Sequence, residues 1–284
     1  ESDADRVMRS AMSKLFREEP DVREVIKLKA IYDLLETITG NRVNYSANVL
    51  GGVKIDVSDK QADAVRRGMD FLEERTKHYM KVVTEDETFL GRTRNIGTMT
   101  LEQATLLGAI GPTARASGLP RDVRVDSPYA GYPEFPVKIV TAEAGDLEAR
   151  FVVRIKELYE SYRLVREILD HLPEGELTAR IPRRIPEGEI VSRVEAPRGE
   201  LFYFIKSNGS DKPERVKVRT PSLCNWASVL TTAIGHKLAD MPMILAGIDP
   251  CFSCNDRMVM IKGESNQQVW DWEDLRQYGI EYYK

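Results

Sequence analysis

The chain has 284 residues, 42% of them hydrophobic, which is enough for one large domain or two closely packed ones. Its net charge of −4 excludes the broad basic surface of a nucleic-acid-binding protein, so no nucleic-acid partner is expected. Apolar stretches such as residues 241–248 are too short to span a bilayer, and no amino-terminal signal is visible, so any membrane association is expected to depend on partner proteins.

The first 40 residues are predicted to be helical. Apolar residues recur at helical spacing from Val25 to Ile38, and Gly40 stands where a helix would end. Residues 41–57 alternate in polarity around Gly51-Gly52, and this pattern predicts extended chain with a turn.

Two capping boxes predict the next helix starts. Ser58 and Thr100 are each followed three residues later by Gln, which is typical of the first turn of a helix. The first helix is expected to run to about residue 81 and the second through residue 107. Residues 111–136 are rich in Gly, Pro, Ser and Arg with little periodicity, so a long loop is expected there.

Residues 146–172 carry the strongest helical pattern, with apolar side chains on one face and Pro173 at the end. A proline-rich connector is expected over residues 173–186. Pro221 is well placed to begin another helix, which is expected to run to about residue 238.

A small β element is predicted within residues 189–219. Residues 189–194 and 201–206 are strand-like, and Asn208-Gly209 is typical of a hairpin turn before a further strand over residues 215–219.

The remaining segments complete a fold that is mainly α with this small β element, an α+β class. Residues 241–248 predict a buried apolar segment. Residues 258–261 predict a strand, and the polar, aromatic tail after them predicts a short helix. No internal repeat is visible. We expect residues 1–284 to form a single domain.

The motif with the clearest chemistry is a pair of cysteines near the end of the chain, Cys251 and Cys254. Two thiols at this spacing can point at one metal ion. Half of a structural zinc site, a redox-active dithiol and a pair of inert buried cysteines are the alternatives. Zinc would need two more ligands, and no second cysteine pair exists in this sequence; the three histidines are scattered. Three cysteines are also too few for a disulfide framework, which favours a reducing setting.

Two further residues, Arg198 and Ser222, are each weak evidence for function when taken alone. Arg198, between Pro197 and Gly199, is either a surface turn residue or a guanidinium held rigidly by a tight backbone. Ser222 stands at a helix start, where it is either a plain capping residue or a donor for an anion. Cys224, one turn further on, is expected to be a small buried residue.

Taken together, these motifs resemble the large subunit of [NiFe] hydrogenases and its relative, the 49-kDa-type subunit of complex I. The similarity extends over nearly the whole chain and is strongest to the membrane-bound, energy-converting hydrogenases and the related sulfane reductase of archaea. It implies a hydrogenase large-subunit-like helical bundle. It rests on six segments: Thr39-Gly40-Asn41-Arg42, Gly51-Gly52-Val53, Gly111-Pro112-Thr113-Ala114-Arg115-Ala116-Ser117-Gly118, Glu195-Ala196-Pro197-Arg198-Gly199-Glu200, Thr220-Pro221-Ser222 and Ile248-Asp249-Pro250-Cys251.

The resemblance implies a role for each matching residue. Cys251 would be a terminal nickel ligand and Cys254 a bridging one in a Ni–Fe centre whose iron carries CN and CO. Arg198 and Asp249 match the residues that form a canopy over the metals. The three residues that match positions lining the diatomic ligands are Pro197, Pro221 and Ser222.

The resemblance also implies cofactors, partners and a location. The family's other thiolate pair, in an amino-terminal Cys-Gly-x-Cys motif, is absent from this sequence, and we expect the chain to lack the family's N-terminal segment. The expected partners are a small iron–sulfur subunit holding a 4Fe-4S cluster, a complex I 30-kDa-like subunit and membrane-embedded antiporter-like subunits. The chain would be a peripheral subunit on the cytoplasmic face of the cell membrane.

Three functions follow as hypotheses. The first is the oxidoreductase activity of a [NiFe] hydrogenase, 2 H⁺ + 2 e⁻ to H2, coupled to ion translocation. The second is a related reductase of sulfane or polysulfide, or a complex I-like subunit that lacks an intact Ni–Fe centre. Quinone reduction is disfavoured because complex I-type subunits generally lack the cysteine pair. The third is a scaffold subunit with a vestigial cysteine pair.

Overall fold

The computed structural model describes residues 47–182, 184–255 and 272–282. The helix predicted for the first 40 residues and the strand predicted over residues 258–261 lie outside this part of the chain. Within the described residues, no helix is both long enough and apolar enough to cross a bilayer.

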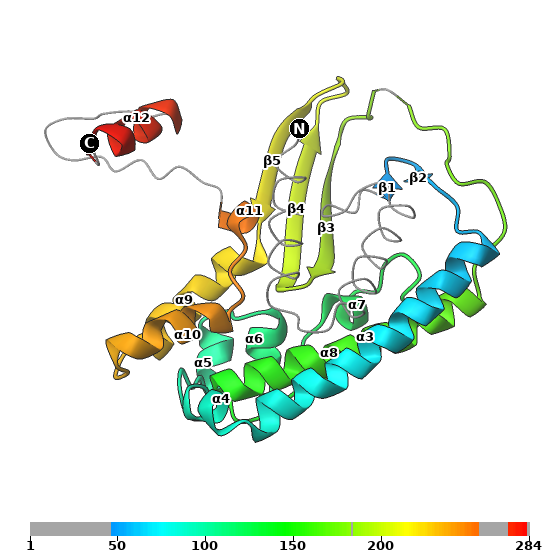
Figure 1. Ribbon diagram of the computed structural model, residues 1–284. Helices are drawn as coiled ribbons and strands as arrows, with labels where there is room; N and C mark the ends of the chain where they lie inside the picture. The colour runs from blue at the N-terminus through cyan, green and yellow to red at the C-terminus, as the bar shows by residue number, and fades with distance from the viewer. Residues whose placement is uncertain (1–46, 183, 256–271, 283–284) are drawn as a thin grey trace, which may run out of the picture.

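Two long helices lie side by side and form one flank of the molecule (Figure 1). They are α3 (Asp59–Glu85) and α8 (Leu147–Asp170). Arg66 binds Asp170 at 2.7 Å near one end, and the hydroxyls of Thr76 and Tyr162 meet at 2.8 Å in the buried middle. From the first contact to the second, the residue number increases on α3 and decreases on α8, so the two helices run antiparallel.

The predicted helix starts are confirmed. The Gln61 side chain accepts a hydrogen bond from the backbone N–H of Ser58, and α3 then runs four residues beyond the predicted end. Thr100 and Gln103 exchange both bonds of a capping box at the start of α5 (Leu101–Leu106).

The start of α8 depends on the buried carboxylate of Asp146. One oxygen accepts from the N–H of Ala149 at 2.9 Å and the other from the N–H of Asn95 at 2.8 Å. We expect Asp146→Ala to lower the free energy of unfolding by about 2–3 kcal/mol, because it removes a helix cap and also the part-buried bond from the N–H of Asn95. Urea unfolding of the purified protein measures this.

Asp86→Ala is the matched control for this change. Asp86 caps α4 (Glu87–Gly91) through a single, exposed bond to the N–H of Phe89, so its loss should cost only about 1 kcal/mol. Equal losses in the two variants would contradict the role assigned to the second bond of Asp146.

The segment from 111 to 136 corrects the prediction of a long loop. It contains two short helices, α6 (Gly111–Arg115) and α7 (Val123–Asp126), and residues 111–117 are all buried. Periodicity did not reveal these helices because each is at most five residues long and α6 is buried on every side. Gly111 and Pro112, which suggested a loop, are buried and allow the backbone of α6 to pack closely against its neighbours.

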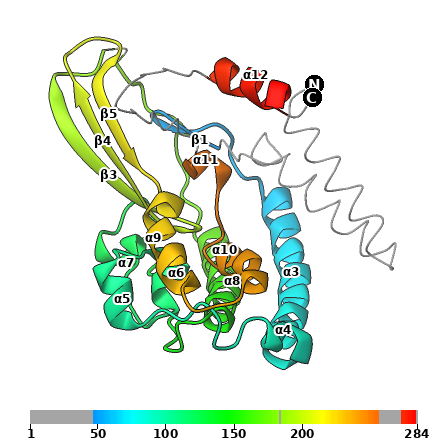
Figure 2. The ribbon, with the colours of Figure 1, turned by 90° about the vertical axis from the view of Figure 1, so that its left-hand side faces the viewer.

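The β element is a three-stranded antiparallel sheet in the order β3-β4-β5, as predicted. Ala196 pairs with Gly199, so only two residues form the turn between β3 and β4. This end of the hairpin lies against α6 and α7, while the other end extends away from the helices (Figures 1 and 2). The strands are β3 (Gly188–Ala196), β4 (Gly199–Ser207) and β5 (Pro213–Arg219).

The predicted extended turn near Gly51-Gly52 is also confirmed, as the short pair β1 (Asn48–Val49) and β2 (Gly52–Val53). The connector that follows α8 contributes a single bridge, between Gly52 and Thr178, and otherwise carries no named element within its described residues.

The helix that begins at Pro221 is shorter than predicted. It ends at Ala233 because the chain turns at Gly235, whose φ is +89°. The segment predicted to be buried is helix α10, but only one face of it is buried, since Leu245 is 37% exposed. The buried cluster of Leu147, Val229, Ile244 and Ile248 packs α8, α9 and α10 together. The last elements are α9 (Pro221–Ala233), η1 (Leu238–Asp240), α10 (Met241–Gly247), α11 (Phe252–Asn255) and α12 (Trp272–Tyr282). The architecture is α+β with a dominant helical part, as predicted.

Candidate functional site

The turn of the β3–β4 hairpin meets the loop that follows α10. Arg198 stands in the two-residue turn, and its Nη2 donates to Oδ1 of Asp249 at 2.9 Å. Its Nε donates to the backbone carbonyl of the same residue. Two bonds from one guanidinium fix its direction. Arg198 and Asp249, predicted to act together, therefore do lie together.

A pair of glycines lets the hairpin turn come this close to α6. A Cβ on Gly199 would lie 2.7 Å from the nitrogen of Gly111, and one on Gly111 would lie 2.3 Å from the carbonyl oxygen of Arg198. Asn225 of α9 supports the same contact, since its side chain accepts from the N–H of Ile110 and donates to the carbonyl of that residue. Arg198 is therefore held by backbone packing on both sides of the turn.

We expect Gly199→Ala to lower the free energy of unfolding by more than about 2 kcal/mol and to displace Arg198 from Asp249. The physical reasons are its φ of +125° and the backbone contact that a methyl group would meet. Urea unfolding measures the first effect and a structure of the variant the second. Gly209→Ala is the control, because its φ is +82° but it has open space around it. Equal losses in both variants would mean that the close approach contributes nothing.

The two cysteines lie at the start of α11. The N–H of Cys254 donates to the carbonyl of Cys251 at 3.2 Å, and the thiol of Cys251 lies 3.1 Å from the hydroxyl of Ser253. Both are half-buried and free of disulfides. The two cysteines therefore lie in one turn, and their binding of a shared ion stays a prediction.

Polar side chains hold this turn against α9. Thr220 donates through Oγ1 to the carbonyl of Cys254 at 2.7 Å, and Asn255 donates to the carbonyl of Cys251 at 2.7 Å. Trp226 in turn donates to Asn255 at 2.6 Å. No sequence pattern singles out Trp226 and Asn255, because their contact depends on the loop after α10 folding back onto α9.

Ser222 is fully buried and touches the cysteine turn directly. Its Oγ accepts a hydrogen bond from the backbone N–H of Cys251 at 3.0 Å. The hydroxyl of Ser253 lowers the pKa of Cys251, helped by Cys254 and the charge of Arg198. Burial raises the pKa of Cys254. The site thus favours one thiolate beside a guanidinium and a set of N–H and O–H donors.

Two arginines of α8 lie beneath the end of α10 and were not singled out from the sequence: Arg150 is fully buried and Arg154 is partly buried. Arg154 donates through Nη2 to the carbonyl of Gly247 at 2.9 Å, and Arg150 donates to the carbonyl of Gly97 at 2.7 Å. Burial lowers the pKa of Arg150 to about 10. A cation at the carboxyl end of a helix offsets the unpaired carbonyls there, so Arg154 stabilises the point from which the chain leaves α10 toward Asp249.

A second fully buried arginine fixes the base of the hairpin. Arg115 of α6 is 1% exposed, and its guanidinium binds Glu195 of β3 at 2.9 Å and Glu157 of α8 at 2.7 Å. Asp122, at the start of α7, lies 3.4 Å from the same guanidinium. The strand that delivers Arg198 is therefore fixed to both helices three residues earlier.

The remaining cysteine, Cys224, and the histidine His236 are not part of this site. Cys224 is half-buried rather than buried, and burial raises its pKa. His236 accepts from the N–H of Gly97 at the far end of α9. In residues 47–182, 184–255 and 272–282, no three His, Cys, Asp or Glu side chains group as a metal site. The described part of the chain therefore offers two thiol ligands and no third.

Comparison with known proteins identifies the class. Residues 23–185 and 179–257 match the family described as respiratory-chain NADH dehydrogenase, 49 Kd subunit. The chain belongs to this family, which confirms the predicted resemblance.

Individual relatives point to membrane-bound redox complexes. The carbon monoxide-induced hydrogenase of Rhodospirillum rubrum is 36% identical over 86% of this chain and 66% of its own length. The membrane-bound hydrogenase subunit alpha of Pyrococcus furiosus is 35% identical, over 88% and 62%. An NADH-quinone oxidoreductase subunit of Dehalococcoides mccartyi is 36% identical, over 77% and 60%. The chain thus spans less than two thirds of the length of these relatives.

A solved structure supports the fold. A chain of the membrane-bound sulfane sulfur reductase, an archaeal respiratory membrane complex, superimposes with a TM-score of 0.75 at 32% identity. The match covers 87% of this chain and 69% of that one. The hydrogenase large-subunit-like α+β fold is therefore confirmed.

Proposed function

We propose that this chain is the catalytic-type large subunit of a membrane-bound, energy-converting [NiFe] hydrogenase that reduces protons to H2 and couples the reaction to ion translocation. The observation that carries the proposal is the meeting of Arg198 and Asp249 with the Cys251–Cys254 turn. The names of two relatives, a carbon monoxide-induced hydrogenase and a membrane-bound hydrogenase subunit alpha, support it.

The donor set fits half of a thiolate-bound nickel–iron centre. Cys251 and Cys254 would supply two soft thiolate ligands, and thiolates suit these metals. When bound, the centre would supply the redox chemistry that forms or splits H2. Two further thiolates are required, and this sequence does not contain them.

The remaining residues have roles that follow from their own chemistry. Arg198 presents a permanent positive charge beside the thiols, which favours the thiolate form of Cys251. Asp249 holds that guanidinium in place through two hydrogen bonds. Ser222 and the N–H groups at the start of α9 would donate to anionic CN groups, with Pro197 and Pro221 lining the same space.

The partners are proposals of the same kind. An iron–sulfur small subunit with a 4Fe-4S cluster would deliver electrons, since this chain has too few cysteines for its own relay. A complex I 30-kDa-like subunit and antiporter-like membrane subunits would hold the chain at the cytoplasmic face of the membrane. Exposed apolar side chains on the three-stranded sheet support such a contact. Ile190 is 62% exposed and its neighbour Val191 is 54% exposed, and because successive residues of a strand point to opposite faces, both faces of the sheet carry apolar surface that a partner could cover.

The second candidate is reduction of sulfane or polysulfide by the same subunit. The similarity to the membrane-bound sulfane sulfur reductase favours it, at 32% identity over 87% of this chain. In this second candidate the chain would lack an intact Ni–Fe centre, so the absent thiolate pair would not be required.

One assay of the intact complex separates the two. With reduced methyl viologen as donor, a hydrogenase evolves H2 from protons alone, whereas a sulfane reductase releases sulfide only when polysulfide is present. H2 evolution is the expected result. Sulfide release without H2 would replace the proposed function by the second candidate, and neither activity would leave the scaffold hypothesis.

A further inference from the structure

A cavity of about 400 Å3 opens beside the Arg198–Asp249 pair. Asp249 and Pro197 line one part of it, and Leu158 and Ser161 of α8 line another. Ser161 is exposed and Leu158 is 41% exposed, so the cavity is open to the protein surface at α8. At its other end, the side chain of Asp249 is 44% exposed.

The lining suits water better than an apolar ligand. Six charged side chains face the cavity, with as many carboxylates as guanidiniums: Arg115, Arg124, Arg154, Glu157, Glu195 and Asp249. Several waters fit in this volume, and each needs two to four polar partners, which this lining provides. Balanced charge disfavours an anion as the resident group.

Glu157 is the carboxylate placed to exchange protons along this route. It lies one residue from the exposed Leu158, and its own side chain is 20% exposed. Arg115 holds its Oε1 at 2.7 Å, which fixes the carboxylate within the cavity wall. Glu195 is much less accessible, with a side chain that is 5% exposed and bonds to Arg115 and to the N–H of Val123.

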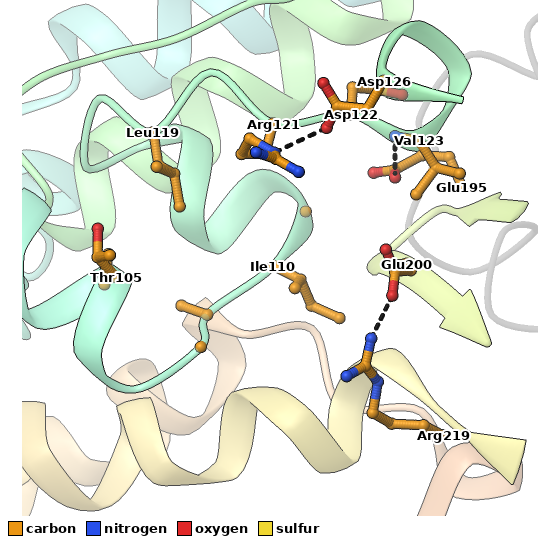
Figure 3. Close-up of a pocket in the computed structure, with 14 residues that line it drawn as sticks. Thr105, Ile110, Leu119, Arg121, Asp122, Val123, Asp126, Glu195, Glu200 and Arg219 are labelled. Carbon is orange, nitrogen blue, oxygen red and sulfur yellow. Dashed lines mark hydrogen bonds and ion pairs between the residues drawn. The ribbon is translucent and has the colours of Figure 1, made fainter. Parts of the chain in front are cut away.

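A second cavity shows why the first is the relevant one. It has about 350 Å3 and lies between α5, α6, α7 and the hairpin, where Glu195 and Glu200 also face it (Figure 3). The N–H of Val123 donates to Glu195, and Arg219 pairs with Glu200 (Figure 3). Asp249 lines the first cavity and not this one, so only the first reaches the Arg198–Asp249 pair.

We propose that the cavity bounded by Leu158, Ser161, Glu157 and Asp249 is a hydrated passage that carries protons between solvent and the Arg198–Asp249 pair, with Glu157 as its relay carboxylate. Glu157 accepts a proton from surface water on one oxygen and releases one to the water inside, so charge is balanced and no electron moves. The inference rests on the proposed function, since both candidate reactions consume protons.

The test uses the intact complex with reduced methyl viologen. Glu157→Gln should slow turnover roughly tenfold or more and raise the solvent isotope effect, because proton delivery becomes limiting. Acetate in the buffer should restore part of the lost rate. Ser161→Phe should slow turnover in the same way by filling the mouth while leaving the Arg115–Glu157 bond in place, and acetate should not rescue it.

Glu160→Gln is the matched control. Glu160 is also a hydrogen-bonded carboxylate on α8, bound to Arg163 and to the N–H of Lys138, but it does not line the cavity. Turnover within about twofold of the parent is expected for it. Wild-type turnover and isotope effect in both Glu157→Gln and Ser161→Phe would overturn the passage.

A high-resolution structure of the complex separates this inference from the proposed function. Ordered waters from Ser161 to Asp249 support the passage even if the complex shows no redox turnover, which would overturn only the function. A dry cavity in an active complex would overturn the passage and leave the function standing.

Discussion

Cys251→Ser should abolish both metal binding and catalytic activity in the intact complex. A serine hydroxyl does not ionise at neutral pH and is a hard ligand, whereas nickel in such a site requires a soft thiolate. The backbone bond from Cys251 to Ser222 needs no side chain, so the fold of the turn should survive. Nickel content and H2 evolution measure the two losses.

Cys224→Ser is the control for this prediction. Cys224 is half-buried on α9 and lies outside the Cys251–Cys254 turn, so the proposed centre does not use its thiol. Its replacement should leave nickel content and activity unchanged. Full activity in the Cys251→Ser variant would overturn the assignment of the thiol pair.

Arg115→Met should lower the free energy of unfolding by about 3–5 kcal/mol. The change leaves the buried carboxylate of Glu195 without its cation, and burial already raises the pKa of that group. Asp122 keeps Arg124 as a partner at 2.7 Å, so Glu195 bears most of the cost. Urea unfolding of the purified protein measures the change.

The same variant should weaken the site, because Glu195 lies three residues before Arg198 on the same hairpin. Arg94→Met is the control. Arg94 pairs with Glu148 at 2.7 Å, but its side chain is 54% exposed, so little measurable change in stability is expected. A loss of stability from Arg115→Met no greater than that from Arg94→Met would contradict the role given to Arg115.

Local rules predicted the parts of the fold that depend on neighbours in the sequence. The capping residue Thr100, the apolar face of α8 and the Asn208-Gly209 turn each act within a few residues, so the pattern carries the information. The two helices within residues 111–126 could not be predicted from the sequence, because they are short and their positions depend on packing against α8 and the hairpin.

The residues of the candidate site also fall into those that could be predicted from the sequence and those that could not. Motif residues such as Arg198, Ser222 and Cys251 could be found from the sequence because their types and order are distinctive. Their supports could not, since Arg115 reaches Glu195 across 80 positions and Trp226 reaches Asn255 across 29. A buried arginine has no signature in a sequence, because its carboxylate partners are distant along the chain.

The most direct test of the thiolate site is nickel analysis of the intact complex, isolated without oxygen. The proposed function predicts one nickel per copy of this chain, with sulfur ligands visible by X-ray absorption and lost in the Cys251→Ser variant. A fully assembled complex that is redox-active but contains no nickel would contradict it.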